Sequence, residues 1–500
     1  MRSSPAAATR TIPSRSSPTR RCPGNQSPTR RWARCALSWQ APNPPHRPLS
    51  CWGRSPNGVK SSTGIRGRSG RIRLADGLVI AAPASGSGKT LVTLALLRDL
   101  TRRGIKVASA KVGPDYIDPR FHEAATGHAC FNLDGWAMSS ELVASLAAEI
   151  GSGASLTLIE GVMGLFDGPE TGRGSTADLA EDLGLPIVLV VDCSHQAQSI
   201  AALVHGFRTH RPHLALPAVI LNRIASPRHE DILRKALGNL NVTVLGGVPR
   251  DRALQLPSRH LGLVQASEHE DLKSFLDRAA DNVAAHIDIG VLQGLARPIA
   301  PAAPLNVLAP LGQRLAIAHD EAFAFLYPHL LTGWRRAGAE LSFFSPLADE
   351  APAPDADAIF LPGGYPELHA ARLSRAATFL TGLRDAAAKD RLIYGECGGY
   401  MVLGQALIDA EHQEHAMAGL LPVVTSFARR KLHLGYRRLA HEGALPFPAT
   451  LKGHEFHYST IAREGNASAL FEAQDASGRD LGAMGLRCNR VMGSYAHVIA

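Results

Sequence analysis

Short apolar runs alternate with longer periodic segments along most of this chain, starting at Leu78. The short runs predict buried strands, and the segments in which apolar residues recur every three or four positions predict amphipathic helices. Alternation of the two is typical of an α/β fold, in which helices cover a parallel sheet. The predicted strands are 78–82, 107–111, 156–160, 187–192, 218–222 and 242–246, and the predicted helices are 90–103, 141–149, 177–183, 199–209, 228–237 and 271–286.

A segment rich in Pro and Ala, 291–304, follows this first group of elements and predicts a linker. Beyond it, further apolar runs predict a second set of strands at 315–318, 340–344, 358–361 and 392–394. We therefore expect a first α/β domain at 76–290 and a second one at 305–500.

The net charge of +9 arises in the first 75 residues. These hold 15 of the 53 Lys and Arg residues and none of the 44 Asp and Glu residues, so the rest of the chain carries 38 basic and 44 acidic groups. The segment 1–75 is rich in Arg, Ser and Pro and lacks apolar periodicity, so we expect it to be disordered. Its composition resembles a transit peptide, but translation from a start placed too far upstream is the favoured explanation, because the first predicted element begins only near Leu74.

Composition also excludes several classes of function. The body of the protein is mildly acidic and offers no basic patch for nucleic acid. No apolar run approaches the roughly 18 residues of a membrane span. The cysteines are scattered without C-x-x-C spacing, so neither disulfides nor structural zinc are expected. We expect a cytoplasmic protein without nucleic acid or membrane partners.

The run YGECGGY at 394–400 is the most distinctive chemical motif. It places Cys397 between glycines, where a predicted strand turns into a helix predicted at 401–407. The glycines allow the positive φ of a sharp turn, as in the nucleophile elbow of hydrolases. At a helix N-terminus, the dipole and the free N–H groups favour the reactive thiolate. We therefore interpret Cys397 as a nucleophile rather than as a buried, inert thiol.

A second motif, the run PASGSGKT at 83–90, follows the first predicted strand and predicts a phosphate-binding loop. The common pattern has Gly where this chain has Pro83, but the G-K-T that carries the chemistry is present. Lys89 would contact the β- and γ-phosphates, and the Thr90 hydroxyl would bind Mg²⁺. The predicted ATP-binding residues of the loop are Gly86, Ser87, Gly88, Lys89 and Thr90.

Polar residues gather at the ends of other predicted strands, which is where an open α/β sheet binds its ligand. Glu160 and Asp167 lie on one Gly-rich loop, and either carboxylate could hold Mg²⁺. Asp115 lies in the loop KVGPDYIDP at 111–119, and Asn222-Arg223 is a candidate adenine contact. Taken singly, such acids are more often solvated loop residues. Their convergence beside a phosphate loop favours a functional site.

These motifs together resemble the cobyrinate a,c-diamide synthase family, and most closely its branch that acts on hydrogenobyrinate. The resemblance extends from about residue 76 to the end of the chain. It rests on the segments 82–90, 111–119, 160–168, 256–264, 344–349, 361–368 and 453–458.

The resemblance implies a dethiobiotin-synthetase-like P-loop domain followed by a class I glutamine amidotransferase domain. The family are ligases of cobalamin biosynthesis, in which ATP activates the c and then the a acetate of the corrin as an acyl phosphate. Ammonia released from glutamine then displaces the phosphate. The implied cofactor is Mg²⁺ and the implied partners are a corrinoid, glutamine and ATP, with a homodimer left open.

The family also implies roles for individual residues. Cys397 would attack glutamine, His497 would activate the thiol, and backbone N–H groups around Gly363 and Gly364 would form the oxyanion hole. Many class I amidotransferases carry Glu two residues after that histidine, where this chain has Ile499, so the third member of the triad is left open. The other implied roles are Mg²⁺ binding by Thr90 and Glu160, and corrinoid binding by Asp115, Tyr116, Ile117 and Asp167.

Alternative functions differ in substrate or in class. Cobyrinic acid, nickel-sirohydrochlorin or the acceptor of cobyric acid synthase could replace hydrogenobyrinic acid in the same two-domain design. A P-loop switch ATPase of the partitioning type belongs to another class. Cys397 with His497 argues against the switch, because a switch has no use for a glutaminase.

Overall fold

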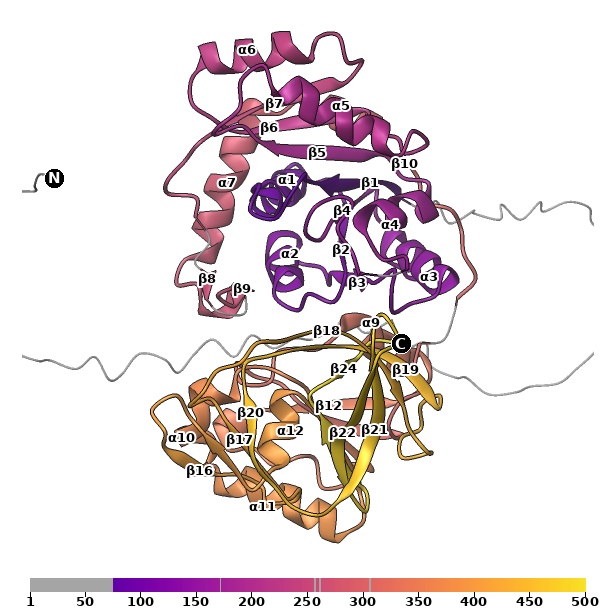
Figure 1. Cartoon of the computed structure of the whole chain (residues 1–500), viewed down its shortest axis with the longest axis vertical. Helices are drawn as coiled ribbons and strands as arrows, with labels where there is room; N and C mark the ends of the chain where they lie inside the picture. Colours follow the sequence, from indigo (N-terminus) through magenta and orange to yellow (C-terminus); the bar gives the residue numbers. More distant parts are fainter. Residues whose placement is uncertain (1–74, 171, 256–257, 260–261, 305–306) are drawn as a thin grey trace, which may run out of the picture. The chain divides into compact units, whose positions relative to one another are not determined.

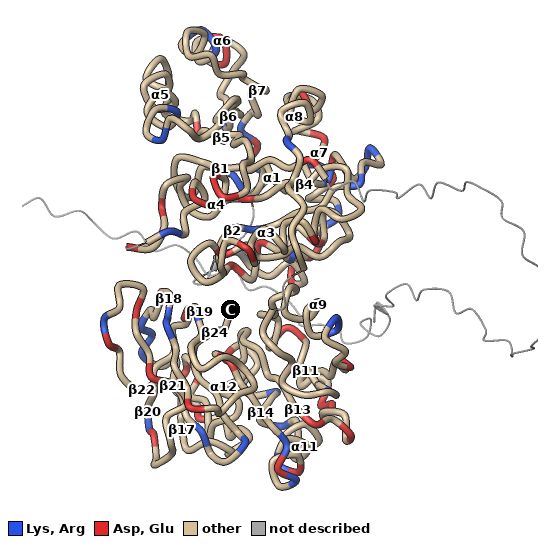
Figure 2. The backbone as a smooth tube through the Cα atoms, turned by 90° about the vertical axis from the view of Figure 1, so that its right-hand side faces the viewer, with Lys and Arg blue, Asp and Glu red and all other residues tan. Residues whose placement is uncertain are grey.

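The computed structural model describes residues 75–170, 172–255, 258–259, 262–304 and 307–500. The predicted leader at 1–75 lies outside these ranges except for Ala75, as do parts of the family segment 256–264. The described residues belong to one compact unit. In the described part of the chain, no helix has the length and apolar character needed to cross a membrane. Lys and Arg are interspersed with Asp and Glu along the described backbone (Figure 2).

The first sheet has the order β3-β2-β4-β1-β5-β6-β7, and all of these neighbours are parallel. The α/β fold class predicted from the alternating pattern is therefore confirmed. A short strand, β10, pairs antiparallel with the start of β1. The strands are β1 (Asp76–Ala81), β2 (Val107–Val112), β3 (Phe131–Leu133), β4 (Leu156–Glu160), β5 (Ile187–Asp192), β6 (Ala218–Ile224), β7 (Thr243–Pro249) and β10 (Arg297–Pro298).

Helices cover the first sheet and bury its apolar strands. Helices α1, α2 and α7 group together on one side, with α3 and α4 on the other (Figure 1). Every residue of β2 and β4 is buried, as a strand between two helical layers requires. The helices are α1 (Lys89–Arg102), α2 (Asp118–Thr126), α3 (Ser140–Gly151), α4 (Thr176–Leu183), α5 (Ile200–His210), α6 (Pro227–Leu237), α7 (Leu272–His286) and α8 (Ile289–Leu295).

Several elements of this half were missing from the sequence prediction. Helix α2 and strand β3 are short, and their apolar residues are too few to show a period. The segment 291–304, predicted to be a linker, instead contains most of α8 and all of β10. Leu292 and Ile299 anchor it, since both are buried against the core. The short pair β8 (Ser258–Arg259) and β9 (Gly262–Leu263) precedes the 3₁₀ turn Ala266–Glu268.

The second sheet has ten strands in the order β12-β11-β13-β14-β23-β22-β21-β18-β19-β24. Its first five strands are parallel and its remaining neighbours are antiparallel. The strands are β11 (Arg314–Ala318), β12 (Glu340–Phe344), β13 (Ala358–Leu361), β14 (Leu392–Glu396), β18 (His433–Ala440), β19 (Thr450–His457), β21 (Ser468–Asp475), β22 (Asp480–Cys488), β23 (Val491–Ser494) and β24 (His497–Val498).

A third, four-stranded sheet and short helices complete this half. The sheet comprises β15 (Ala406–Ile408), β16 (Glu414–Ala416), β17 (Val423–Ser426) and β20 (Thr460–Glu464). The helices are α9 (Pro328–Arg336), α10 (Ala370–Leu373), α11 (Ala377–Ala388) and α12 (Gly398–Leu403), with 3₁₀ turns at Pro346–Ala348 and Pro366–His369.

The four strands predicted here correspond to β11, β12, β13 and β14, whereas the antiparallel part was not predicted. The helix predicted at 401–407 is also wrong in its bounds. Helix α12 begins directly after Cys397 and ends before Gly404, and β15 then occupies the rest of the apolar run. A short apolar run fits a buried helix and a buried strand equally well, so periodicity could not separate the two.

Candidate active sites

The predicted phosphate-binding loop connects β1 to α1, as its sequence requires. Gly86 and Gly88 have φ values of 79° and 87°, which favour glycine. A Cβ at position 88 would lie 2.2 Å from the side-chain nitrogen of Asn222. That amide donates a hydrogen bond to the Ser87 carbonyl over 2.9 Å. Asn222, predicted to contact adenine, therefore also holds the phosphate loop in shape.

The loop borders a cavity of about 990 Å³. Lys89, Thr90, Asp115 and Arg223 are among the predicted residues that line it. The predicted loop residues Gly86 and Gly88 line it as well, together with Arg250, which the sequence analysis missed. An isolated Arg after a strand gave no motif by which it could have been found.

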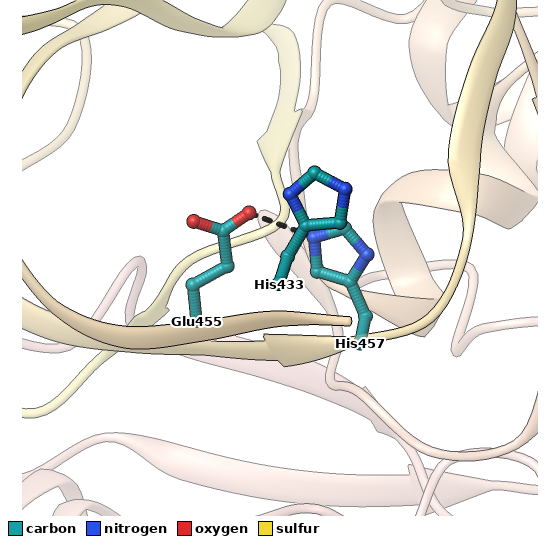
Figure 3. A group of neighbouring side chains, drawn as sticks. All are labelled: His433, Glu455 and His457. Carbon is teal, nitrogen blue, oxygen red and sulfur yellow. Dashed lines mark hydrogen bonds and ion pairs between the residues drawn. The ribbon is translucent and has the colours of Figure 1, made fainter. Parts of the chain in front are cut away.

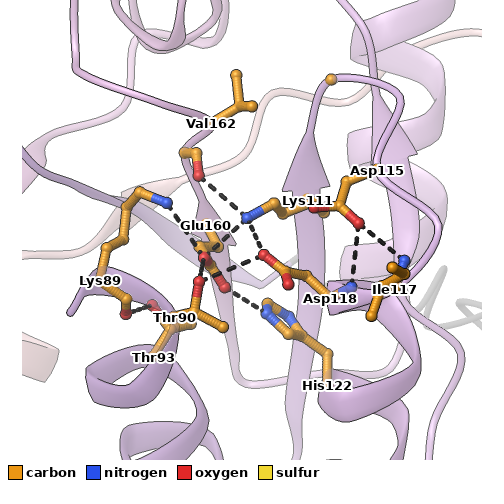
Figure 4. A network of polar contacts seen from close by, with 12 residues as sticks. Lys89, Thr90, Thr93, Lys111, Asp115, Ile117, Asp118, His122, Glu160 and Val162 are labelled. Carbon is orange, nitrogen blue, oxygen red and sulfur yellow. Dashed lines mark hydrogen bonds and ion pairs between the residues drawn. The ribbon is translucent and has the colours of Figure 1, made fainter. Parts of the chain in front are cut away.

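Behind this cavity lies a buried network of charged side chains centred on Glu160 (Figure 4). The Thr90 hydroxyl donates to Glu160 Oε1 over 2.6 Å, and the same oxygen accepts from Lys89 over 3.2 Å and from Lys111 over 2.8 Å. The other oxygen, Oε2, lies 2.6 Å from His122 Nε2. Glu160 has no exposed surface and does not line the cavity.

The network contains three functional candidates that sequence reasoning did not select. Lys111 bridges Glu160 to Asp118. Its Nζ lies 2.8 Å from Glu160 Oε1 and 2.5 Å from Asp118 Oδ2. Asp118 also accepts from the Thr90 hydroxyl over 3.3 Å and lines the cavity. Lys111 and Asp118 occur in the family segment 111–119, but only the tertiary structure shows that they meet Glu160. His122 follows one turn later on α2.

Opposite charges set the protonation states within this network. Burial alone would lower the pKa of Lys111, but Asp118 and Glu160 outweigh burial and raise it above its usual range. Burial alone would raise the pKa of Glu160, but Lys111 and Lys89 hold it well below its usual range. Although burial opposes it, contact with Cys130 and Glu160 raises the pKa of His122 to about 10. Burial and the charge of Lys111 lower the pKa of Lys89.

The predicted corrinoid residues fall into different surroundings. Asp115 Oδ1 accepts the backbone N–H groups of Ile117 and Asp118 over 2.8 and 3.1 Å, so it holds the loop before α2. Burial and the neighbouring Asp118 raise the pKa of Asp115 to about 6. Asp167 is exposed, lines neither of the larger cavities, and accepts the Gly164 N–H over 2.8 Å.

Tyr116 is buried and reaches into the second half of the protein. Its ring lies 4.6 Å from the imidazole of His497 and 5.1 Å from the ring of Phe325, measured between centroids. Tyr116 and Ile117 line a second cavity, of about 670 Å³, whose other lining residues include Arg120 and Arg372. The loop 111–119 thus borders both cavities and contacts the predicted glutaminase histidine.

The predicted nucleophile lies in a sharp turn between β14 and α12. Cys397 has φ 46° and ψ −102°, and its N–H donates to the Ser494 carbonyl over 2.8 Å. This strained, left-handed conformation at a non-glycine residue is what a nucleophile elbow requires. Burial and the charge of Glu367 raise the pKa of the Cys397 thiol above its usual range. The expectation that the helix N-terminus would favour the thiolate therefore does not hold in this arrangement, because desolvation outweighs it.

Gly363 lies against both predicted catalytic side chains. A Cβ at position 363 would lie 2.3 Å from His497 Cε1 and 3.2 Å from Cys397 Cβ. A Cβ at Gly398 would lie 3.1 Å from the backbone nitrogen of Gly364. The structure therefore brings Cys397, His497, Gly363 and Gly364 together. No side chain fits between these groups, which explains the glycines.

His497 is fully buried, and burial lowers its pKa to about 3. Glu396 Oε2 lies 3.8 Å from His497 Nδ1. Glu396 is the residue directly before the nucleophile. It belongs to the motif at 394–400, which does not by itself reveal a role for this acid.

A further polar cluster lies on β18 and β19 (Figure 3). His433, Glu455 and His457 place their ligand atoms within 4.8 Å of one another, which is close enough to hold a metal ion. Glu455 is already paired, however, with His457 and with Arg437, each over 2.7 Å. The Arg437 guanidinium supplies the positive charge that a metal ion would otherwise bring.

Comparison with known proteins defines the class first. Residues 78–264 match the CobQ/CobB/MinD/ParA nucleotide binding domain, and residues 314–500 match the CobB/CobQ-like glutamine amidotransferase domain. The chain is thus a nucleotide-binding protein joined to a glutamine amidotransferase, an arrangement typical of a glutamine-dependent ligase.

Curated relatives specify the family. A hydrogenobyrinate a,c-diamide synthase of Brucella abortus biovar 1 (strain 9-941) is 61% identical over 427 residues, which cover 85% of this chain and 98% of that protein. Proteins of the same name from Sinorhizobium sp and Rhodobacter capsulatus are 54% and 52% identical, again over 85% of this chain and 98% of each relative. The chain belongs to the hydrogenobyrinate a,c-diamide synthase family.

Proposed function

We propose that this protein is a ligase that amidates the a and c acetate groups of hydrogenobyrinic acid, using ATP and glutamine, in cobalamin biosynthesis. The observation that carries the proposal is the presence of two sites in one compact unit. One is a phosphate loop on a nucleotide-sized cavity, and the other is a cysteine elbow with a histidine beside it. A switch ATPase has no use for the second site.

The first site would activate the acceptor. A carboxylate is a poor electrophile until one of its oxygens becomes part of a phosphate leaving group. The acceptor oxygen attacks the γ-phosphorus of ATP, ADP leaves, and an acyl phosphate forms. Lys89, at the loop that lines the cavity, would stabilise the negative charge on the transferring group. Asn222 and Arg223 line the same cavity and would contact the base.

The oxygen donors near the phosphate loop fit Mg²⁺. The Thr90 hydroxyl and the Asp118 carboxylate both line the cavity and lie 3.3 Å apart, and hard oxygen ligands are what this ion prefers. Bound there, Mg²⁺ would supply positive charge for the transferring phosphate. Glu160, the acid predicted as a ligand, does not line the cavity. Instead it accepts the hydrogen bond of the Thr90 hydroxyl and so orients it.

The second site would release ammonia. Cys397 Sγ attacks the side-chain amide carbon of glutamine, its proton passes to His497 and then to the leaving nitrogen, and water hydrolyses the thioester. Backbone N–H groups at Gly363 and Gly364 would bind the oxyanion. Ammonia then attacks the acyl phosphate and displaces phosphate. The cavity of about 670 Å³ beside Tyr116 would hold the corrinoid acceptor, because it borders the loop shared by both sites.

Removal of the nucleophile tests this proposal. Cys397→Ala should abolish glutamine-dependent amidation but retain amidation driven by high ammonium, because only the ammonia source is lost. Cys488→Ala is the matched control, since this thiol is half-buried at the end of β22, and it should retain both activities. Loss of both activities in Cys397→Ala, or of neither, would contradict the assignment of the nucleophile.

The identity of the acceptor needs a separate experiment. Purified protein would receive ATP, Mg²⁺, glutamine labelled with nitrogen-15 in its amide, and either metal-free or cobalt-containing a,c-diacid. Mass spectrometry should find two labelled amides on the metal-free corrinoid. Preferential labelling of the cobalt-containing acid would assign the protein to the cobyrinate branch. A cytoplasmic location and a homodimer stay predictions of the sequence.

A further inference from the structure

The predicted glutaminase histidine needs a group that orients its ring. Both ring nitrogens of His497 are buried and make no hydrogen bond within the described part of the chain. To accept the thiol proton at Nε2, the neutral imidazole must carry its own proton on Nδ1. The position at which many class I amidotransferases have an orienting Glu is Ile499 here.

Glu396 lies on the Nδ1 side of this ring. Its Oε2 is 3.8 Å from His497 Nδ1, and both side chains are almost completely buried. The two residues come from β14, which ends directly before Cys397, and from β24 near the end of the chain. The distance is about 1 Å longer than a charge-assisted hydrogen bond, so a small movement of either side chain would close it.

Two hydrogen bonds hold the Glu396 carboxylate, and both are made to Oε1 rather than to Oε2. The backbone N–H of Val498 donates to Oε1 over 3.0 Å, and the Tyr394 hydroxyl donates to the same atom over 3.1 Å. Val498 adjoins His497, so the carboxylate is attached to the strand that carries the histidine. Oε2, the atom nearest the imidazole, has no donor among these bonds.

The geometry points to Glu396 as the positioning residue that orients the ring of His497 and stabilises its protonated form in glutamine hydrolysis. This inference rests on the proposed function. The ionised carboxylate accepts the Nδ1 proton of His497, and the Nε2 lone pair then faces the thiol. As Sγ forms its bond to the amide carbon, the thiol proton moves to Nε2, and Glu396 stabilises the resulting imidazolium. The sequence G-E-C thus carries its orienting acid one residue before the nucleophile.

This arrangement depends on the protonation of Glu396. Burial raises the pKa of Glu396 to about 8, while the Val498 N–H and the Tyr394 hydroxyl act in the opposite direction. The titratable groups that face it are His497, Cys397, Tyr394, Tyr116 and Tyr327. A protonated Glu396 would donate to Nδ1 and force the proton of the ring onto Nε2, which blocks acceptance from the thiol. Glutamine hydrolysis should therefore rise with pH through about 8 as Glu396 ionises, and level off above that pH.

Two variants and a control test the inference. Glu396→Gln should lower kcat for glutamine by on the order of 100-fold, less than the roughly 10⁴-fold loss when the orienting acid of a serine-protease triad becomes its amide, because the Glu396–His497 distance is longer than a hydrogen bond. The KM for glutamine and the ammonium-dependent amidation should change little. Glu396→Asp should recover part of the rate, and Glu472→Gln, an exposed acid on β21, should behave as the native protein.

The pH profile supplies a readout that a structural role would not affect. In the native protein, kcat/KM for glutamine should rise with pH through an apparent pKa near the ionisation of Glu396, and Glu396→Gln should lose that rise. A native profile that stays flat between about pH 6 and 9, or a Glu396→Gln variant within about 3-fold of the native kcat, would overturn the inference. A flat native profile would refute the inference even if the variant does not fold.

Failure of this inference differs from failure of the proposed function. If Cys397→Ala abolishes glutamine hydrolysis while Glu396→Gln leaves it intact, only the role of Glu396 is refuted. If Cys397→Ala retains glutamine hydrolysis, the glutaminase assignment itself is wrong.

Discussion

Replacement of Glu160 by Gln tests the buried network beneath the nucleotide cavity. The change removes one negative charge and leaves the shape of the side chain almost unaltered. Glu160 accepts from Thr90 and lies within 3.2 Å of Lys89, 2.8 Å of Lys111 and 2.6 Å of His122. The Gln amide cannot accept from all four, and its NH₂ group would face at least one of these donors.

The magnitude follows from the burial of the network. Removal of one partner of a buried ion pair typically costs about 3–5 kcal/mol, because the opposite charges remain buried without compensation. Here Asp118 still pairs with Lys111, so we expect a loss of roughly 3 kcal/mol, at the lower end of this range. Turnover should also fall by orders of magnitude, because the Thr90 hydroxyl and the Lys89 ammonium lose the group that orients them.

Two assays separate these effects. Urea denaturation with and without ATP would report the stability of the nucleotide-binding half, and amidation with high ammonium would report acceptor activation without the glutaminase. Ammonium should not rescue Glu160→Gln, since activation precedes the attack of ammonia. Asp231→Asn, an exposed acid on α6, is the control. A loss of stability below about 1 kcal/mol together with near-normal turnover would refute the reasoning.

Three further changes test other contacts. Asp115 holds the loop that carries Tyr116 and Ile117 to the second cavity, so Asp115→Asn should raise the KM for the corrinoid or alter the ratio of monoamide to diamide in product analysis, whereas a change in the KM for ATP alone would contradict this role. Tyr116→Ala should open space beside His497 through which ammonia can escape, so that glutamate released exceeds amide formed several-fold; a ratio that stays at one would show that this ring does not retain ammonia. Burial alone would raise the pKa of Glu455, but His457 and Arg437 lower it to about 2, so its contribution to stability is present above about pH 4.5 and is lost as pH falls toward 2. Acid unfolding in that range should be weaker in Glu455→Gln, and an unchanged profile would exclude this carboxylate as its cause.

The first sheet was largely predictable because its signal is local. Strands β4 and β5 occupy the predicted ranges, since each is a mainly apolar run that is buried on both faces. The antiparallel strands β18, β19, β21 and β22 were not predicted. Their residues alternate only partly between buried and exposed, and pairing along the second sheet decides their place rather than periodicity.

The functional residues also divide into those that local sequence determined and those that only tertiary packing brought together. The sequence alone determined the phosphate loop and the cysteine turn, because Gly-rich turns specify their backbone conformation within a few residues. Only the tertiary structure decided that Lys111 and His122 converge on Glu160, across 49 and 38 positions of the chain, and that Glu396 faces His497. It also decided the direction of each pKa shift. Desolvation and the approach of opposite charges depend on which surfaces pack together, and no local run of residues contains that information.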